Sequence, residues 1–449
     1  MENYFGFWDY FIFISYALLI LIIGLLASRT KKGHEKNAED YFLASRSLPW
    51  WAIGASLIAA NISAEQFIGM SGSGFALGLG IASYEWMGAL TLLIVGKYFL
   101  PIFIDKQLYT IPEFVEKRYS TTLKTILAVF WIGLYTFVNL TSVLYLGGLA
   151  LETILGVDMV YAIIGLALFA AAYSLYGGLS AVAWTDIIQV VFLILGGLVT
   201  TYLALDTVSD GEGIWEGLNL IYDRVPDHFD MILDVSNPEY VNLPGIGVLV
   251  GGLWVANLYY WGFNQYIIQR TLAAKSLQES QKGILFAAAL KLIIPFIVVV
   301  PGIAAYVIVN SPEMLISLGE QGLVNIPSVG ASDKAYPWLM QFLPTGLKGI
   351  AIAALAAAIV SSLASMLNST STIFTMDIYK QYFNKNASNG TMVNIGRLSS
   401  TIALVIATLI APLLGGLDQA FQKRPSKKTA KIPGLTIPVY SWINWKAWS

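Results

Sequence analysis

Long apolar runs alternate with shorter polar connections along most of this chain. A helix needs about 20 apolar residues to cross a bilayer, and ten of the runs reach that length. They lie near residues 7–27, 48–71, 79–104, 125–151, 158–176, 182–204, 245–269, 283–309, 347–377 and 395–415. The pattern therefore predicts an all-α integral membrane protein with ten spans.

The second run is interrupted by polar and flexible residues at a depth where a helix would normally be continuous. The polar stretch 61–66 leads directly into the glycine-containing stretch 69–74. Backbone groups freed from a helix find no partners in hydrocarbon, so a break here should face protein or a water-filled cavity. Secondary transporters place their substrate and coupling ion at such broken helices.

The polar connections differ in charge in a regular way. Lysine and arginine gather after the first, third, seventh and ninth runs, whereas the long segments 205–244 and 310–346 each contain a single cation, Arg224 and Lys334. Cytoplasmic connections of membrane proteins carry the excess of lysine and arginine. The N-terminus is therefore expected outside.

Composition narrows the range of functions. The chain is 56% hydrophobic and 12% charged, with a net charge of −2, no cysteine and two histidines. A nucleic-acid partner would call for a basic face, and disulfides or thiolate chemistry require cysteine. Histidine-based metal sites and Ser-His-Asp triads have almost no histidine to use, and the sequence shows neither a Walker A loop nor an HExxH motif. We expect neither an enzyme nor a nucleic-acid-binding protein.

Two charged residues fall deep inside predicted spans, where a charge costs several kcal/mol. Glu85 lies about 9 Å and Lys291 about 12 Å into its span, counted from the helical rise per residue. One interpretation is a hydrogen-bonding pair around a polar solute, and the other is a structural ion pair between packed helices. We favour the first, because a broken helix accompanies the two charges.

The seventh span carries aromatic residues beside amides in its middle, with Asn257, Tyr260 and Trp261 followed by Asn264 and Gln265. This combination suits a pyranose, because a ring stacks on the C–H face of the sugar while amides bond its hydroxyls. An aromatic belt at the membrane interface would explain the rings but not the amides.

The ninth span places Ser361 and Ser362 among alanines. Small residues permit close helix packing, but adjacent hydroxyls, together with carbonyls of the broken second span, also suit a hard cation such as sodium. Asp186, which opens the sixth span, either attracts a departing cation or is a first-turn acid that the helix dipole favours.

The stretch 423–449 departs from the pattern, because it is basic and contains three prolines, Pro425, Pro433 and Pro438. It is either a short external tail or the result of a sequence that is truncated or shifted out of frame after Gln422. We expect the second, and hence a C-terminally incomplete bundle followed by an aberrant tail.

Several stretches resemble the sodium:solute symporter family, and most closely its bacterial sodium/galactose members, which are related to the sodium/glucose cotransporters. The resemblance is carried by LPWWAIGASLIAANISAEQFIGMSGSG, ASYEWM, LYGGLSAVAWTDIIQV, GGLWVANLYYWGFNQYIIQRTLAAKS and AAIVSSLASMLNST, and it covers about residues 8 to 422. It implies a LeuT-like fold of two inverted repeats within a symporter domain, residues 1–422. The first repeat would span about 48–204 and a partial second repeat about 245–422.

The same resemblance implies roles for individual residues. The sugar site would comprise Asn61, Gln66, Glu85, Asn257 and Lys291, with Tyr260 stacking on the sugar as the inner gate and Trp261 beside it. The outer gate would comprise Met70, Tyr84 and Phe421. Sodium would bind the carbonyls of Ala59, Ile62 and Ala358 and the hydroxyls of Ser361 and Ser362, and Asp186 would help it leave. One departure is Gly88, where sugar transporters of the family have a serine.

The expected function is sodium-coupled uptake of a monosaccharide, galactose or glucose, by alternating access across the bacterial inner membrane. The partners would be sodium, a small sugar and the lipid bilayer. Two alternatives stay open: a sodium symporter for another polar solute, such as proline or pantothenate, and a non-transporting sensor or truncated form.

Overall fold

The computed structural model describes residues 6–414, except residues 30–34, 64, 238–239, 241–242, 244 and 320–325. The described part is built of helices, and its only β-type pairing is an isolated bridge between Leu48 and Ala274. The predicted outer-gate residue Phe421 and the basic tail 423–449 lie outside the described residues.

Nine helical stretches of the described part are long and apolar enough to cross a membrane. They are α1 (Phe7–Ala27); Glu65–Asp105, with α4 (Ser71–Leu77), α5 (Ser83–Ile94) and α6 (Leu100–Asp105); Thr121–Glu152, with α8 (Thr121–Gly133) and most of α9 (Leu140–Leu155); α10 (Met159–Gly177); α11 (Leu179–Val208); Gly245–Phe263, with α13 (Gly245–Gly247) and α14 (Leu253–Leu258); α16 (Leu277–Val309); Leu347–Phe383, with α20 (Leu347–Ile373); and Asn389–Leu413, with α21 (Asn389–Ile410). The shorter helices are α2 (Ala38–Leu43), α3 (Trp50–Asn61), α7 (Ile111–Arg118), α12 (Ile214–Arg224), α15 (Gln265–Leu272), α17 (Pro312–Ser317) and α19 (Ala335–Met340).

The difference from the ten predicted spans lies in the second one, 48–71, which is not a single helix. Helix α3 has 12 residues and stops at Asn61, after which Ile62 is extended, with ψ 107°. Helical structure resumes as a π-helical turn at Glu65–Met70. A 12-residue helix covers only about 18 Å, too little to cross the bilayer alone. The expected break is present, and the part of the span that follows it continues into the stretch Glu65–Asp105.

A second break interrupts the predicted seventh span. The π-helical turn Tyr259–Phe263 ends at Asn264, whose backbone is extended with φ −82° and ψ 118°, and α15 begins at the next residue. The amide-rich middle of this span therefore lies where helical hydrogen bonding is interrupted.

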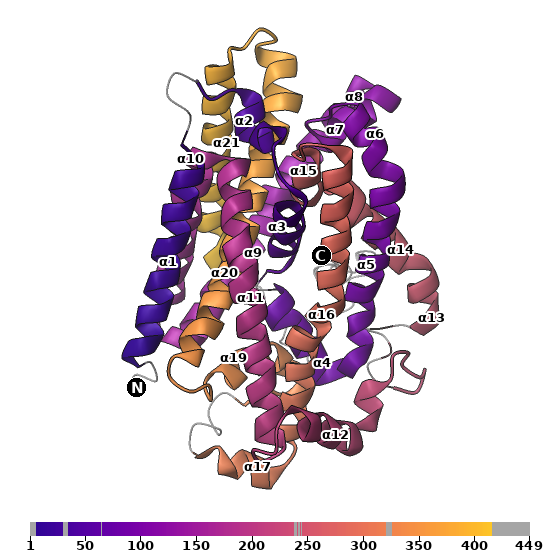
Figure 1. The fold of residues 1–449 in the computed structure, drawn as a ribbon, viewed down its shortest axis with the longest axis vertical. Coiled ribbons are helices and arrows are strands. Elements are labelled where there is room, and N and C mark those ends of the chain that lie inside the picture. The colour runs from indigo at the N-terminus through magenta and orange to yellow at the C-terminus, as the bar shows by residue number, and fades with distance from the viewer. Residues whose placement is uncertain are drawn as a thin grey trace, which may run out of the picture.

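The connections separate to the two ends of the bundle as their charges predict. In Figure 1 the N-terminus, α12 and α17 lie at the lower end, and α2, α7 and α8 lie at the upper end. At the lower end the Arg224 guanidinium donates to Ser311 Oγ (3.0 Å), and at the upper end Arg46 donates to the carbonyl of Gln107 (3.0 Å). The two segments poor in cations thus share one end of the molecule.

Helices α16 and α20 occupy the interior, and α16 packs against both halves of the broken span. Glycines allow this approach: a Cβ at Gly54 of α3 would lie 2.7 Å from the Gly283 carbonyl oxygen of α16. Near the other end of α16, a Cβ at Gly302 would collide with the Ser71 carbonyl of α4. The break in the second span is therefore supported by one continuous helix.

Candidate substrate and sodium sites

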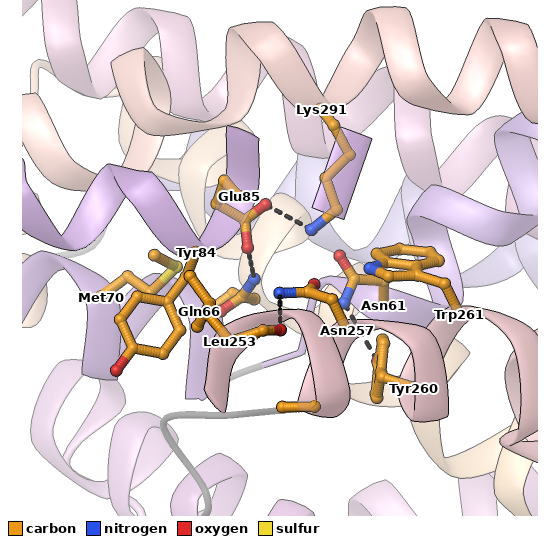
Figure 2. Close-up of a pocket in the computed structure, with 11 residues that line it drawn as sticks. Asn61, Gln66, Met70, Tyr84, Glu85, Leu253, Asn257, Tyr260, Trp261 and Lys291 are labelled. Carbon is orange, nitrogen blue, oxygen red and sulfur yellow. Dashed lines mark hydrogen bonds and ion pairs between the residues drawn. The ribbon is translucent and has the colours of Figure 1, made fainter. Parts of the chain in front are cut away.

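A pocket lies beside the break that follows α3, and side chains from four helical segments line it (Figure 2). The lining residues are Asn61, Gln66, Met70, Tyr84, Glu85, Leu253, Ala256, Asn257, Tyr260, Trp261 and Lys291. The structure thus brings together all seven residues predicted to contact substrate, together with two predicted residues of the outer gate, Met70 and Tyr84.

The acidic centre of the pocket is Glu85, which is 4% exposed. Gln66 Nε2 donates to its Oε1 (2.6 Å), and the Lys291 ammonium forms an ion pair with its Oε2. The same ammonium lies 4.8 Å from the centre of the Trp261 ring. A buried charge without a partner is strongly destabilising, so each of these two charges needs the other.

The aromatic side of the pocket centres on Tyr260. Its hydroxyl accepts a hydrogen bond from Asn61 Nδ2 (3.0 Å) and shares another with the hydroxyl of Tyr266 (2.8 Å). The rings of Tyr260 and Trp261 are nearly perpendicular, with centres 5.1 Å apart. Asn61 Oδ1 is buried, and no described residue donates to it. The pocket thus contains an acceptor that a bound molecule can satisfy.

The pocket is narrow in this conformation. The centre of a water molecule can move through only about 20 Å³ of it, enough for water but far too little for a hexose. Gly88 shows how tight the wall is, because a Cβ there would lie 2.9 Å from Trp261 Nε1 and 3.3 Å from Asn257 Oδ1. Entry of a sugar therefore requires these side chains to move outwards.

The predicted sodium ligands come from the end of α3 and the middle of α20, and the structure packs these two segments together. Ser362 Oγ donates to the carbonyl of Ala60 (3.2 Å), in the last turn of α3. Carbonyls at a helix end lack intrahelical donors, and the last turn of α3 ends at the break. Ala59, Ile62 and Ala358 are fully buried, so their oxygens lie in a water-poor environment.

Asp186 occupies a more central position than its sequence context suggested. It lies in the third turn of α11 and is completely buried. Ser361 Oγ donates to its Oδ1 (2.6 Å), and Ser56 Oγ donates to its Oδ2. In this conformation the predicted sodium ligand Ser361 is therefore bound to the predicted exit residue.

Arg270 is a residue whose position the sequence did not reveal, because it was counted among the cations of a cytoplasmic connection. It is instead 1% exposed. Its Nε donates to Ser56 Oγ (2.8 Å), its Nη2 donates to Ser365 Oγ (2.7 Å), and it also donates to the Tyr266 carbonyl. A signal was available in QYIIQR, where Gln265, Gln269 and Arg270 all fall within one short helix after the break.

Two further acids were also missed: Asp9, which is fully buried, and Glu65, which is half-buried. Glu65, beside the break, accepts a hydrogen bond from Ser142 Oγ of α9 (2.8 Å). Asp9 of α1 accepts the backbone N–H groups of Gly346 (2.7 Å) and Gly349 (2.8 Å), where α20 begins. Both contacts join segments far apart in the sequence, so spacing along the chain could not indicate them.

The fold and the pocket together define a class of protein. Nine apolar helical stretches within the described residues make it a multi-pass membrane protein. Two interrupted helices meet at a narrow polar pocket, and secondary transporters build their binding sites in this way.

Comparison with known proteins identifies the family. The model of the sodium:solute symporter family matches residues 41–418, and the chain belongs to this family. It is 65% identical over 446 residues to the sodium/glucose cotransporter of Vibrio parahaemolyticus, an alignment that covers 99% of this chain and 82% of that protein. It is 36% identical over 425 residues to the human sodium/myo-inositol cotransporter 2, covering 90% of this chain and 61% of that protein.

A solved structure supports the same fold. The chain resembles a Na⁺-coupled sialic acid symporter in its substrate-bound outward-open state, with a TM-score of 0.79 and 24% sequence identity. The alignment covers 91% of this chain and 83% of that one. The predicted LeuT-type helical architecture is confirmed.

Proposed function

We propose that this protein couples the entry of sodium to the uptake of a neutral monosaccharide, galactose or glucose, by alternating access. The observation that carries the proposal is the hydrogen-bonded group of Gln66, Glu85 and Lys291 that lines the pocket at the broken helix. The sodium/glucose cotransporter of Vibrio parahaemolyticus, with 65% identity, supports it.

The charges of the pocket favour a neutral substrate. Glu85 and Lys291 neutralise each other, so the site offers no net charge to bind an anion such as pantothenate. Sugar hydroxyls both donate and accept, and they can replace the bonds that the pocket residues now make with one another. Asn61 Oδ1, which lacks a donor among the described residues, would gain one. Each such bond contributes about 0.5–1.5 kcal/mol net.

Sodium would act by ordering the junction of α3 and α20. Its ligands would be the carbonyls of Ala59, Ile62 and Ala358 and the hydroxyls of Ser361 and Ser362, which are buried at or beside that junction. Because Asn61 lies in the same last turn of α3 and donates to Tyr260, an ion that fixes this turn also fixes the inner gate. By linkage, sodium and sugar then strengthen each other's binding by the same factor.

Release would proceed towards the end of the bundle that carries α2 and α7. Asp186, in the third turn of α11, binds Ser361 and would be the next carboxylate that a departing cation meets. We place this end in the cytoplasm of a bacterium and the N-terminus outside the inner membrane, because lysine and arginine gather in the connections at this end.

The test is transport by the full chain in proteoliposomes. Labelled galactose and glucose should enter when sodium is outside and should not when choline replaces it, and unlabelled proline should not compete. Glu85→Ala should abolish uptake, whereas Glu212→Ala, which removes an exposed carboxylate far from the pocket, should leave it unchanged. Equal uptake in sodium and choline would refute the coupling, and binding without uptake would favour a sensor.

A further inference from the structure

Two cations converge at the upper end of the bundle, away from the pocket. Lys36, in the connection before α2, donates from its ammonium to the carbonyl oxygens of Ser28 (3.2 Å), Tyr176 (3.2 Å) and Gly177 (3.4 Å). Arg397 of α21 donates from Nη2 to the same Tyr176 carbonyl (3.3 Å). The two side chains thus meet at the end of α10.

Both cations also lie over the same two aromatic rings. Lys36 Nζ is 5.5 Å from the centre of the Tyr176 ring and 5.9 Å from that of Tyr41. The Arg397 guanidinium carbon is 5.2 Å and 5.7 Å from these centres. Two positive charges are therefore held close together on a shared aromatic surface.

No described carboxylate forms an ion pair with either cation. Asp40 is the acid whose charge acts on Lys36, but its oxygens accept hydrogen bonds from Asn37 N (3.0 Å) and Ser45 Oγ (2.6 Å). Arg397 Nε is buried and lacks a partner among the described residues. Burial and, next, the nearby Arg397 lower the pKa of Lys36 to about 8. The two charges repel each other, and the charge of Asp40 offsets this repulsion without forming an ion pair.

The position of this pair indicates what neutralises it. Helices α2, α10 and α21 pack together at this end (Figure 1), and the Tyr176 side chain is 54% exposed. Exposed apolar side chains continue along both spanning helices, with Leu168 of α10 at 66% and Val405 of α21 at 51% exposure. A ligand at the cations would thus have charge partners at one end and lipid-facing helix surface below them.

We propose that Lys36 and Arg397, with the face of Tyr176, bind the phosphate of an anionic phospholipid whose acyl chains lie along α10 and α21. Basic pockets between spanning helices recognise such headgroups. A free phosphate offers the same charge but no chains for the apolar surface below, so the lipid is the better match. The orientation proposed above puts this lipid in the cytoplasmic leaflet, but the site itself does not depend on transport.

The test uses the full chain in detergent, titrated with dioctanoyl phosphatidylglycerol, dioctanoyl phosphatidylcholine or inorganic phosphate, with retained lipid counted by native mass spectrometry. Phosphatidylglycerol should bind more tightly than phosphatidylcholine. Lys36→Gln and Arg397→Gln should each weaken its binding about fivefold, and the double variant should lose the preference. Arg397→Lys, which keeps the charge, should retain most of it.

Arg118→Gln is the matched control, because Arg118 lies over a single ring, Tyr119, at the same end (5.9 Å), and it should bind lipid like the parent. Sodium-dependent sugar binding by each variant shows that it is folded. The proposal is wrong if the parent binds both lipids equally, or if Arg118→Gln weakens binding as much as Arg397→Gln. It is also wrong if inorganic phosphate binds the parent as tightly as phosphatidylglycerol.

Discussion

The guanidinium of Arg270 lies 3.8 Å from the carboxylate of Asp186, and both side chains are fully enclosed by the protein. Ser56 joins them, because its hydroxyl accepts from Arg270 Nε and donates to Asp186 Oδ2. Asp186 also holds Ser361, a predicted sodium ligand. A buried charge network therefore adjoins the proposed sodium site.

Removing the acid of this network should destabilise the protein. Asp186→Asn keeps one acceptor oxygen, loses the other and leaves Arg270 as an uncompensated buried cation, which should cost about 3–5 kcal/mol. The midpoint of thermal unfolding should fall, and half-maximal uptake should need more sodium. Asp186→Asn combined with Arg270→Gln should recover part of the stability, and a double variant that is less stable than either single variant would contradict the pairing.

The charge of Glu85 in the pocket can be tested separately from the size of its side chain. Glu85→Gln keeps the size of the side chain but removes the charge that Lys291 needs. Loss of a charge-assisted hydrogen bond of about 1.5 kcal/mol corresponds to at least a tenfold rise in KM for sugar. Uptake kinetics at saturating sodium provide the measurement. An unchanged KM would mean that this ion pair is only structural.

The Tyr260 hydroxyl has a role distinct from that of its ring. Tyr260→Phe removes the bonds to Asn61 and Tyr266 while leaving an aromatic face for the sugar. We expect sugar affinity to change little and sodium to be required at roughly fivefold higher concentration, since one bond of about 1 kcal/mol no longer links the gate to α3. Tyr260→Ala should abolish sugar binding as well. Identical behaviour of the two variants would argue against a separate link through the hydroxyl.

Replacing a sodium ligand should change only the dependence of uptake on the sodium concentration. Ser362→Ala removes the hydroxyl that contacts the last turn of α3, and about fivefold more sodium should be needed for half-maximal uptake. Ser369→Ala is a useful comparison, because Ser369 is a buried serine of the same helix that donates instead to Gln269. Equal shifts in both variants would contradict the assignment of Ser362.

Low pH should weaken the packing of α7 against α8. Burial opposes ionisation of Glu116, but hydrogen bonds from Lys124 and Thr121 outweigh it and lower the pKa of its carboxyl. A depressed pKa stabilises the fold above the ordinary value of 4.5, and this contribution disappears as the pH falls through the folded value. The unfolding midpoint should therefore drop below pH 4.5, and Glu116→Gln should flatten that drop. If the unfolding midpoint of Glu116→Gln falls as steeply at low pH as that of the parent, other groups cause the fall.

The sequence predicted those parts of the structure that local chemistry determines. Apolar run lengths located the spanning helices, and the polar stretch 61–66 marked a break that the structure places after Asn61. Glu85 and Lys291 were singled out because a charge inside a span needs a partner, and the structure pairs them.

Contacts between distant segments could not be read in this way. Arg270 looked like an ordinary cation of a connection, and only the folding of α15 towards α11 shows that it faces Asp186. Asp9 and Glu65 likewise bind partners on remote helices. The narrowness of the pocket could not be predicted either, since it depends on how Trp261 packs over Gly88.

The support that α16 gives to both halves of the broken span bears on how such a protein can change its cargo. The close backbone contacts at Gly54 and Gly302 prevent α3 and α4 from sliding along α16. The segment that carries Gln66 and the helix that carries Lys291 therefore keep fixed positions relative to each other. Substituting side chains on these helices alters selectivity while the backbone positions that carry them stay fixed. A single inserted residue in α16 would instead swing Lys291 by about 100° and break the match with its acid.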